Sequence, residues 1–526
     1  MASPDVITKE KDLTFSIQSV TSNATGFVGA FRWGPVNDPE LISTTEAEII
    51  KKFMSPNTET AVDFLSAANY LLYANPLYIV RASGPAAFNS VPPTKTAKYL
   101  KNFAEYQGAT LTGYSFLGRF PGVVGNSLKI SVANKTGYST WAYKSSFAYT
   151  PGDDATFNVA IIDVDGVISG SAGTVLETYE LMSKTLGAKK TDGTTAYIKQ
   201  AIEDSSRWVY CGDVDSIDLT VDGLYEVTLV LGADDNDPEN VLYSDGLDVF
   251  MNNETINVFR YFVSQASAQS KLIDVCDYRL DSVGFVAPRL SDVYNAVAPE
   301  ETIQSYFDVT LNKNTSYGFG VDNWKLVYDK YRDTNVWIPC SSDAAGLHAR
   351  AVAQNEAWTS PAGLNRGQLK NVIRLAYNPS KTQRDVLWES NINSICSFPG
   401  EGVVLWGDKT LYKAPSAFSR INVRSLFIVL KKNISRSARY MLFELNDETT
   451  RNLFQGSTDR YLDTIQSRGG VYAKKVICDE SNNTSDVIDA NEFVGDIYVK
   501  PARSINAIRL NFIAVGSGVS FEEIEG

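Results

Sequence analysis

Two short segments at opposite ends of the chain constrain its architecture most, because each has the pattern of a β-strand without a partner strand next to it. Their apolar residues alternate with mostly polar ones and are, near the start, Leu13, Phe15 and Ile17 and, near the end, Ile508, Leu510 and Phe512. A period of two is typical of a strand that buries one face. Such strands either pair with each other or with a sheet of their own subunit, or they add to a sheet of another subunit. The pattern alone leaves both arrangements open.

The composition is that of a folded protein with several domains. The 526 residues are 44% hydrophobic and 21% charged, enough for roughly three to four domain-sized cores. The net charge of −13 repels phosphate, so we expect no direct binding of nucleic acid. The sequence shows neither a secretory signal nor the ~18 consecutive apolar residues of a membrane span, so we expect no membrane insertion. The five cysteines lie far apart, which fits buried thiols in a reducing compartment.

The parts of the chain next to the two terminal segments have the periodicities of a mixed α/β fold. Near the start, the expected elements are a strand over 26–33, a short helix around Ile49, a helix over 60–73 and a strand over 77–80. From residue 337 onward, they are strands over 337–340, 403–406, 471–478 and 493–499 and helices over 344–354, 420–440 and 449–468. Pro76 supports the end of the second helix, because proline cannot continue a helix.

Residues from about 86 to 335 have a different texture, rich in Gly, Thr, Ser and Asp, with short alternating runs such as 128–132. This texture predicts a β-rich region with some α/β content. Near its end we expect a helix over 254–271 and a short buried strand over 284–287.

The sequence contains no arrangement of side chains that points to catalysis. Its one histidine, His348, lies in a predicted helix between small residues, where a packed histidine is the usual case. No G-x-S-x-G motif is present, and Pro35 stands where a phosphate-binding loop starting at Gly29 would need lysine. The acidic turn 234–237 lacks the glycine and distal glutamate of an EF-hand, so we expect a solvated turn. We therefore expect no catalytic residue, no cofactor and no bound metal.

The predicted helix over 420–440 carries many cations and no acidic residue. They alternate with apolar residues and are Arg420, Arg424, Lys431, Lys432, Arg436 and Arg439. This is a basic amphipathic helix. Either its basic side is a solvated surface partly neutralised by Glu444, Asp447 or Glu448, or it docks on an acidic surface of a partner or a second copy.

Several stretches of the chain carry a resemblance to a known family. They are FRWGP at 31–35, AANYL at 67–71, VRA at 80–82, WTSPAGLNRG at 358–367, LWGDKT at 405–410, RINVRSLF at 420–427, FELND at 443–447 and PARSIN at 501–506. Together they resemble the tail sheath protein of contractile-tailed (T-even-like myovirus) bacteriophages, over nearly the whole chain.

The resemblance implies a multidomain α/β (α+β) fold with a discontinuous mixed α/β core and terminal arms that donate strands. Its expected parts are an N-terminal arm (1–22), a core in two pieces (23–90 and 345–505), inserted outer domains, β-rich then α/β (91–344), and a C-terminal arm (506–526). In this family the arms exchange between neighbouring subunits, which favours strand donation by the two alternating segments. Their apolar residues would then be subunit-interface residues.

The resemblance also implies a structural role in the virion. Copies would assemble in the host cytoplasm as hexameric rings stacked around an inner tail tube, together with baseplate and tail terminator proteins. Contraction would drive the tube through the host envelope to deliver the genome. The basic helix would then face the tube or a neighbouring subunit, and charge reversal at Arg424 and Arg436 should weaken assembly at low salt.

Two observations qualify the resemblance. Larger family members carry a sizeable outer domain soon after the stretch that matches 80–82, but here only about thirty residues separate that stretch from Gly113, so we expect this domain to be reduced or missing. Some members have a core likened to subtilisin, yet a single histidine and no serine motif argue against a degenerate hydrolase. The sheath of a phage-derived device, such as a pyocin or a secretion system, stays an alternative.

Overall fold

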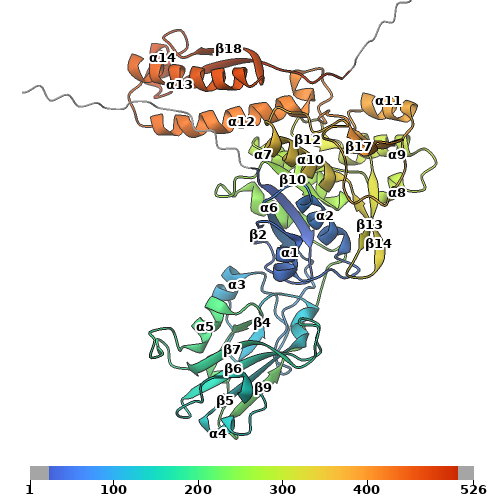
Figure 1. Ribbon diagram of the computed structural model, residues 1–526. Helices are drawn as coiled ribbons and strands as arrows, with labels where there is room; N and C mark the ends of the chain where they lie inside the picture. Colours follow the sequence, from blue (N-terminus) through green and yellow to red (C-terminus); the bar gives the residue numbers. More distant parts are fainter. Residues whose placement is uncertain (1–22, 507–526) are drawn as a thin grey trace, which may run out of the picture. The chain divides into compact units, whose positions relative to one another are not determined.

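The computed structural model describes residues 23–506, which fold into two compact units divided between Leu445 and Asn446. Each unit is a mixed arrangement of helices and strands (Figure 1). The alternating segments at the two ends of the chain, with Leu13, Phe15 and Ile17 and with Ile508, Leu510 and Phe512, lie outside the described residues. The expected pairing of these segments therefore stays a prediction.

The first unit is built on a six-stranded sheet in the order β12-β11-β10-β1-β3-β2. The strands are β1 (Thr25–Ala30), β2 (Pro39–Ile42), β3 (Leu77–Ala82), β10 (Arg260–Val263), β11 (Val283–Val286) and β12 (Gly318–Gly320). All neighbours pair in parallel except β2, which runs antiparallel to β3 at one edge. Every residue of β1 is buried, as expected for the interior of a parallel sheet covered on both faces.

Successive side chains of each strand point to opposite sides of the sheet, so a strand made of apolar residues gives the sheet two apolar faces. Helices cover both faces. Phe27 of β1 packs with α1 (Glu46–Phe53), α2 (Ala61–Leu71) and α10 (Ser341–Gln354). The next residue, Val28, packs with α6 (Tyr243–Met251) and α7 (Gln269–Arg279) on the other face. The predicted strand–helix–helix–strand unit near the start is confirmed by β1, α1, α2 and β3.

One sequence prediction was wrong, and the sheet shows why. The range 254–271, expected as a helix, contains β10, and the helix α7 begins only at Gln269. The run from Val258 to Val263 is apolar and aromatic apart from Arg260, and a short run of this kind cannot be assigned from periodicity alone. Pairing between β1 and β11 makes it a central strand. The expected strand over 284–287 is confirmed as β11.

The range 91–344, expected as inserted outer domains, therefore contains strands of four different sheets. β10, β11 and β12 lie in this range but extend the sheet that β1 and β3 begin. The sequence pattern did not reveal this, because parallel strands pair across long stretches of intervening chain.

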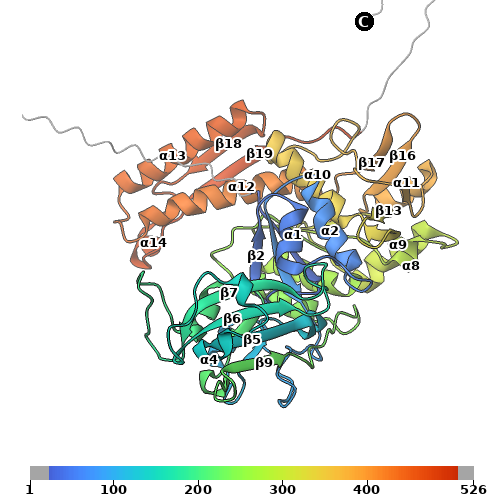
Figure 2. The same ribbon diagram turned by 60° about the horizontal axis from the view of Figure 1, so that its bottom comes forward.

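Residues between β3 and α6 form a separate β-rich body, which confirms the β-rich texture of this part of the sequence. Its four-stranded antiparallel sheet has the order β7-β6-β5-β9, and Figure 2 shows these strands side by side. The elements are α3 (Phe103–Gly108), β4 (Phe116–Gly118), β5 (Leu128–Asn134), α4 (Lys135–Tyr138), β6 (Thr156–Asp163), β7 (Thr174–Ser183), α5 (Ile198–Ser205), β8 (Val209–Cys211) and β9 (Leu224–Thr228). The β-rich body has its own apolar core, which includes Ile130, Val159 and Ile202.

The acidic turn 234–237 is not the solvated turn that the sequence suggested. The carboxylate of Asp235 accepts a hydrogen bond from the backbone N–H of Ala86 (2.9 Å), and its backbone carbonyl accepts one from Gly84 (2.8 Å). Asp234 accepts a hydrogen bond from the backbone N–H of Val123 (3.0 Å). These carboxylates bind backbone N–H groups where the β-rich body joins the parallel sheet, so their role is structural.

The remaining elements of the first unit contribute to the apolar clusters on both faces of the sheet. They are α8 (Leu290–Val293), α9 (Pro299–Ser305), β13 (Trp324–Asp329), β14 (Thr334–Pro339), β15 (Arg374–Leu375), α11 (Lys381–Glu389), β16 (Ser394–Phe398), β17 (Gly402–Trp406) and α12 (Ile421–Ala438). β13, β14 and β15 form one antiparallel sheet, and β16 and β17 form a hairpin. The expected strand at 403–406 and the helices at 344–354 and 420–440 are confirmed.

The described part of the second unit consists of a long helix, a short helix and a two-stranded antiparallel sheet. Its elements are α13 (Glu448–Ser467), β18 (Val471–Ile477), α14 (Ser485–Asp489) and β19 (Asp496–Pro501). Asp447 caps α13 by accepting a hydrogen bond from the backbone N–H of Thr450 (2.7 Å). The sequence placed the second strand at 493–499, three residues before β19 begins.

Candidate functional site

The basic helix predicted from the sequence is α12, whose apolar side packs into the first unit. Ile421, Leu426 and Ile428 are buried at this side. The cations of the helix and of its two flanking positions fall into two groups. The inner group contacts side chains and backbone of other parts of the first unit, and the outer group faces solvent. This division decides which of them are available to a partner.

Arg420 and Arg424 belong to the inner group. The Arg420 guanidinium pairs with Asp408 at 2.9 Å and lies over the ring of Trp388. Arg424 lies between two aromatic rings, with its Cζ 4.3 Å from the Tyr317 centroid and 4.0 Å from the Phe418 centroid. Its Nη1 also donates to the Tyr317 hydroxyl (3.2 Å), and burial lowers the pKa of Arg424.

Lys432 is the third inner cation. Its ammonium donates to Asn257 Oδ1 (2.8 Å) and to the Val258 carbonyl (3.0 Å), and it lies 3.5 Å from the carboxylate of Asp281. Burial lowers the pKa of Lys432 to about 8, and Asp281 opposes this shift. Of the inner cations, Arg420 pairs with Asp408 and Lys432 with Asp281, not with Glu444, Asp447 or Glu448.

Lys431, Arg436 and Arg439 form the outer group. All three are exposed, and none forms an ion pair with any residue in the part of the chain that the structure describes. We call this set the outer cations. They are the members of the basic helix that a partner could reach.

The described part of the chain begins and ends close to a strand. The N-terminal side ends at Asn23, directly before β1, and the C-terminal side follows β19. Within residues 23–506, β18 and β19 pair only with each other, so each keeps one edge free. A free strand edge presents unpaired N–H and C=O groups that can accept another strand.

Asn23 is held by a buried arginine that the sequence analysis missed. Arg260, on β10, donates from Nη1 to the Asn23 carbonyl (3.2 Å) and to Asn23 Oδ1 (2.9 Å). Its Nε donates to His348 Nδ1 (2.6 Å), and His348 Nε2 lies 2.8 Å from Ser425 Oγ on α12. Arg260 is fully buried, and burial lowers its pKa to about 10. A charged residue inside an apolar run was the available signal for this position.

The same contacts settle the role of His348, which the sequence predicted to be a packed residue. Nδ1 accepts from Arg260, so Nε2 carries the proton and donates to Ser425. Burial and the nearby Arg260 charge lower the pKa of His348 well below its usual value. A neutral histidine with both nitrogens engaged inside the core is structural.

Metal-binding clusters and membrane-spanning helices can be assessed for the described residues, 23–506. No group of three or more His, Cys, Asp or Glu side chains among them could hold a metal ion. No helix in residues 23–506 is both long enough and apolar enough to cross a membrane. The five cysteines are buried and unpaired, as the sequence predicted.

Known proteins with similar sequences are tail sheath proteins. The model of the phage tail sheath protein central domain matches residues 239–411, and that of the phage tail sheath C-terminal domain matches residues 413–514. The tail sheath protein of Salmonella phage ViI is 34% identical over 627 residues, covering 99% of this chain and 97% of that protein. That of Enterobacteria phage T4 is 28% identical over 668 residues, covering 100% and 99%.

Solved structures with a similar fold come from contractile systems. The sheath tail protein of Listeria innocua matches with a TM-score of 0.56 and 14% identity, covering 92% of this chain and 96% of that one. The contracted sheath of the extracellular contractile injection system PVC matches with a TM-score of 0.54 and 13% identity, covering 99% of both chains. At these identities the likeness shows the fold: a multidomain mixed α/β protein that resembles contractile sheath subunits.

Proposed function

Because this chain belongs to the phage tail sheath protein family and is a contractile tail sheath subunit of the virion, a structural protein and not an enzyme, we propose that terminal strand exchange links its copies into the sheath. The observation that carries this proposal is the β18–β19 sheet, whose two outer edges pair with no other strand of residues 23–506, in a chain that bears an alternating apolar segment at each end. The N-terminal strand would contribute Leu13, Phe15 and Ile17 and the C-terminal strand Ile508, Leu510 and Phe512.

The proposed assembly is a sheath of stacked hexameric rings around an inner tail tube, joined to baseplate and tail terminator proteins. Solved structures of similar fold support this in general terms, since they include the helical sheath and the baseplate of the anti-feeding prophage, both in the contracted state. Contraction would drive the tube through the host envelope for genome delivery. The subunit itself carries a charge of −13, which disfavours direct contact with nucleic acid.

The proposed domain organisation keeps the arms (1–22 and 506–526) and the discontinuous core of 23–90 and 345–505. We place the strands between Arg260 and Gly320 with this core, because they belong to the sheet of β1 and β3. The insertion then reduces to the β-rich body. It is the part we expect to face outward from the sheath.

The mechanism needs subunits that change their angle without losing their neighbours. Main-chain hydrogen bonds of donated strands would keep the link, and the chain on either side of the core would bend. Asn23 is tied to Arg260, so we place the N-terminal pivot before Asn23. On the other side Pro501 still pairs with Val471, so we propose a second pivot after Pro501. The energy would come from subunit packing, with no nucleotide.

Electron microscopy of the purified chain tests this proposal. The full chain and a chain trimmed to residues 23–504 are imaged by negative stain over the same concentration series. We expect tubes from the full chain and monomers from the trimmed one. Tubes from both chains would contradict strand exchange while leaving the sheath assignment intact, and monomers from both would show that assembly needs a tube or baseplate.

We also propose that the outer cations of α12 face the inner tube or a neighbouring subunit. The support is their exposure and their lack of an acidic partner among the described residues, in a subunit with an acidic surplus. An opposite charge on the facing surface would steer and strengthen docking. The inner cations take no part in this, because aromatic rings and the carboxylates of Asp408 and Asp281 already surround them.

Charge reversal should therefore separate the two groups of cations. The R436E/R439E variant is expected to raise the protein concentration needed for tubes by about 3- to 10-fold at low salt, and the effect should shrink at high salt because exposed charges are screened. R424E should instead lower the unfolding temperature at any salt concentration, since it puts an anion between two aromatic rings. Equal behaviour of R424E and R436E/R439E would contradict this assignment.

The alternative of a phage-derived contractile device has weaker support. The tail sheath protein of Salmonella phage ViI is 34% identical in sequence to this chain. The PVC sheath protein is only 13% identical, so its similarity is evidence of a common fold alone. The alternative of a degenerate hydrolase finds no support in His348, which lies buried and neutral with both ring nitrogens engaged.

A further inference from the structure

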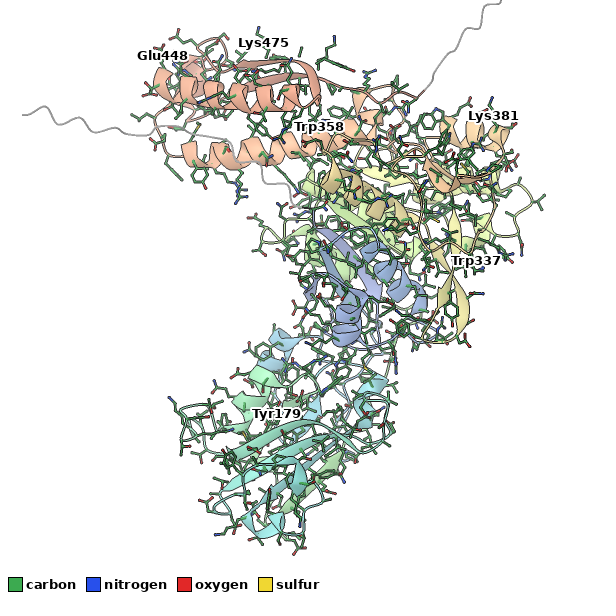
Figure 3. The ribbon with its side chains drawn as sticks, viewed as in Figure 1. Tyr179, Trp337, Trp358, Lys381, Glu448 and Lys475 are labelled. Carbon is green, nitrogen blue, oxygen red and sulfur yellow. The ribbon has the colours of Figure 1, made fainter. Side chains whose placement is uncertain are left out.

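The two faces of the β18–β19 sheet differ in a way that the edge-pairing role does not explain. Lys474 points toward α13, where its ammonium lies 2.7 Å from Asp459 and 3.1 Å from Asp463. The next residue, Lys475, points to the opposite face because successive strand residues alternate. Figure 3 labels Lys475 on β18. One face of the sheet is therefore packed and charge-balanced, and the other is open.

The open face carries two lysines, a tyrosine and, at its end, Asp496, whose carboxylate accepts a hydrogen bond from Asn482 (3.0 Å). Lys475 lies directly opposite Tyr498, and Lys500 lies directly opposite Ala473, so all four side chains share this face. All four are exposed, Tyr498 by 58%. Neither Lys475 nor Lys500 forms an ion pair with any described residue, in contrast to Lys474. We call these four residues the Lys–Tyr face.

Such a face matches an acidic segment that carries an apolar residue. The two ammonium groups would pair with carboxylates, and the Tyr498 ring, next to the small Ala473, offers an apolar platform. The chain itself supplies a segment of this kind after its predicted C-terminal strand, with Glu522, Glu523, Ile524 and Glu525. No other part of the chain outside the described residues has three carboxylates within four positions.

We propose that the Lys–Tyr face binds the acidic segment 522–525 of a neighbouring copy. The inference rests on the proposed strand exchange, which brings the end of one chain to the sheet of the next. This second contact of the same chain end would then slow dissociation of the donated strand from the sheet edge. A contact of this type is salt-dependent, because exposed ion pairs provide most of it.

The length of the chain is sufficient for this contact. Glu522 lies ten positions after Phe512, the end of the alternating segment. Extended, this stretch spans up to ~33 Å, whereas two neighbouring strands lie only ~5 Å apart. The Gly516-Ser517-Gly518 stretch between them can make the turn from the edge onto the face.

Charge exchange in the full chain tests the proposal. The face variant K475E/K500E and the tail variant E522K/E523K/E525K are each expected to raise the concentration needed for tubes by about 3- to 10-fold at low salt, as for a few exposed charge pairs. Combining all five substitutions should restore assembly, because the charges are complementary again. K381E applies a lysine-to-glutamate change at an exposed position of α11, which is not part of the Lys–Tyr face, and should have no effect (Figure 3).

A cross-link decides which copy supplies the segment. Two differently tagged chains, one with E523C and one with Y498C, are mixed and oxidised; the five native cysteines are buried and give little background. A disulfide between the two tagged chains is expected. A disulfide formed only when both substitutions lie in the same chain would overturn the proposal.

The remaining outcomes separate this proposal from the proposed function. If K475E/K500E weakens assembly and the tail change neither weakens nor rescues it, the face binds another acidic surface and the proposal fails. If neither variant changes assembly while trimming to 23–504 abolishes it, strand exchange stands and the face contact is refuted. If the trimmed chain still forms tubes, strand exchange is refuted first.

Discussion

Replacing Leu510 with aspartate is expected to abolish tube formation by the full chain, whereas replacing its neighbour Asn511 with aspartate should leave tubes intact. The two substitutions add the same side chain one residue apart. In a paired strand, adjacent residues point to opposite faces, so only position 510 would place the carboxylate on the buried face. Burying an unpaired charge costs several kcal/mol, and each 1.4 kcal/mol is about a tenfold change in association.

The measurement is the lowest protein concentration at which tubes are seen by electron microscopy, and the unfolding temperature of each unassembled chain serves as the control for folding. The N-terminal segment provides a matched pair, Phe15→Asp and Ser16→Asp, for which we expect the same contrast. Equal effects at neighbouring positions would contradict a strand with one buried face. They would indicate that the segments act as unstructured tethers.

The sequence predicted the fold best where the apolar period is long and unbroken. β1, α2 and β3 appear where the pattern placed them, and α12 and α13 begin within one residue of their expected starts. β10 could not be predicted in the same way. Four residues are too few to show a period, and only its neighbours β1 and β11 make it a strand.

The candidate site shows the same limit at the level of single side chains. Arg424 and Lys431 lie seven residues apart, so they occupy nearly the same side of α12. The sequence pattern therefore assigned both residues to one basic side of the helix. In the fold, Tyr317 and Phe418 cover Arg424, whereas Lys431 is exposed. Tyr317 is brought there by the tertiary fold, and no helical period contains that information.

A buried ion pair illustrates a feature that the sequence could not suggest at all. Lys325 on β13 and Asp343 on α10 pair at 2.8 Å with both side chains fully buried. The ammonium also donates to Asn69 Oδ1 (2.8 Å) and to the Lys370 carbonyl (2.7 Å), so its three protons are engaged. Asp343 accepts a further hydrogen bond from the hydroxyl of Tyr73 (2.6 Å). The group thereby joins α2, α10 and β13 inside one core.

Removing one member of this pair should be the most damaging single change in the first unit. K325M is expected to cost about 3–5 kcal/mol of unfolding free energy, because it leaves the Asp343 carboxylate buried without its cation. The matched control is K330M, which breaks the Lys330–Glu46 pair at the surface, where Lys330 is 59% exposed. That change should cost about 0–1 kcal/mol. Denaturant unfolding of the unassembled chain measures both.

The double variant K325M/D343L distinguishes two contributions to the free energy of unfolding: the cost of a buried unpaired charge and the stabilisation by the ion pair itself. Two apolar residues of similar volume remove both charges, so the double variant should recover most of the loss seen in K325M. Additive losses would instead show that the pair itself stabilises the joint between α2, α10 and β13. If the losses are additive, K325M/D343L should also need a higher concentration than the parent chain to assemble. The reason is that subunit packing in the sheath requires a rigid joint between these elements.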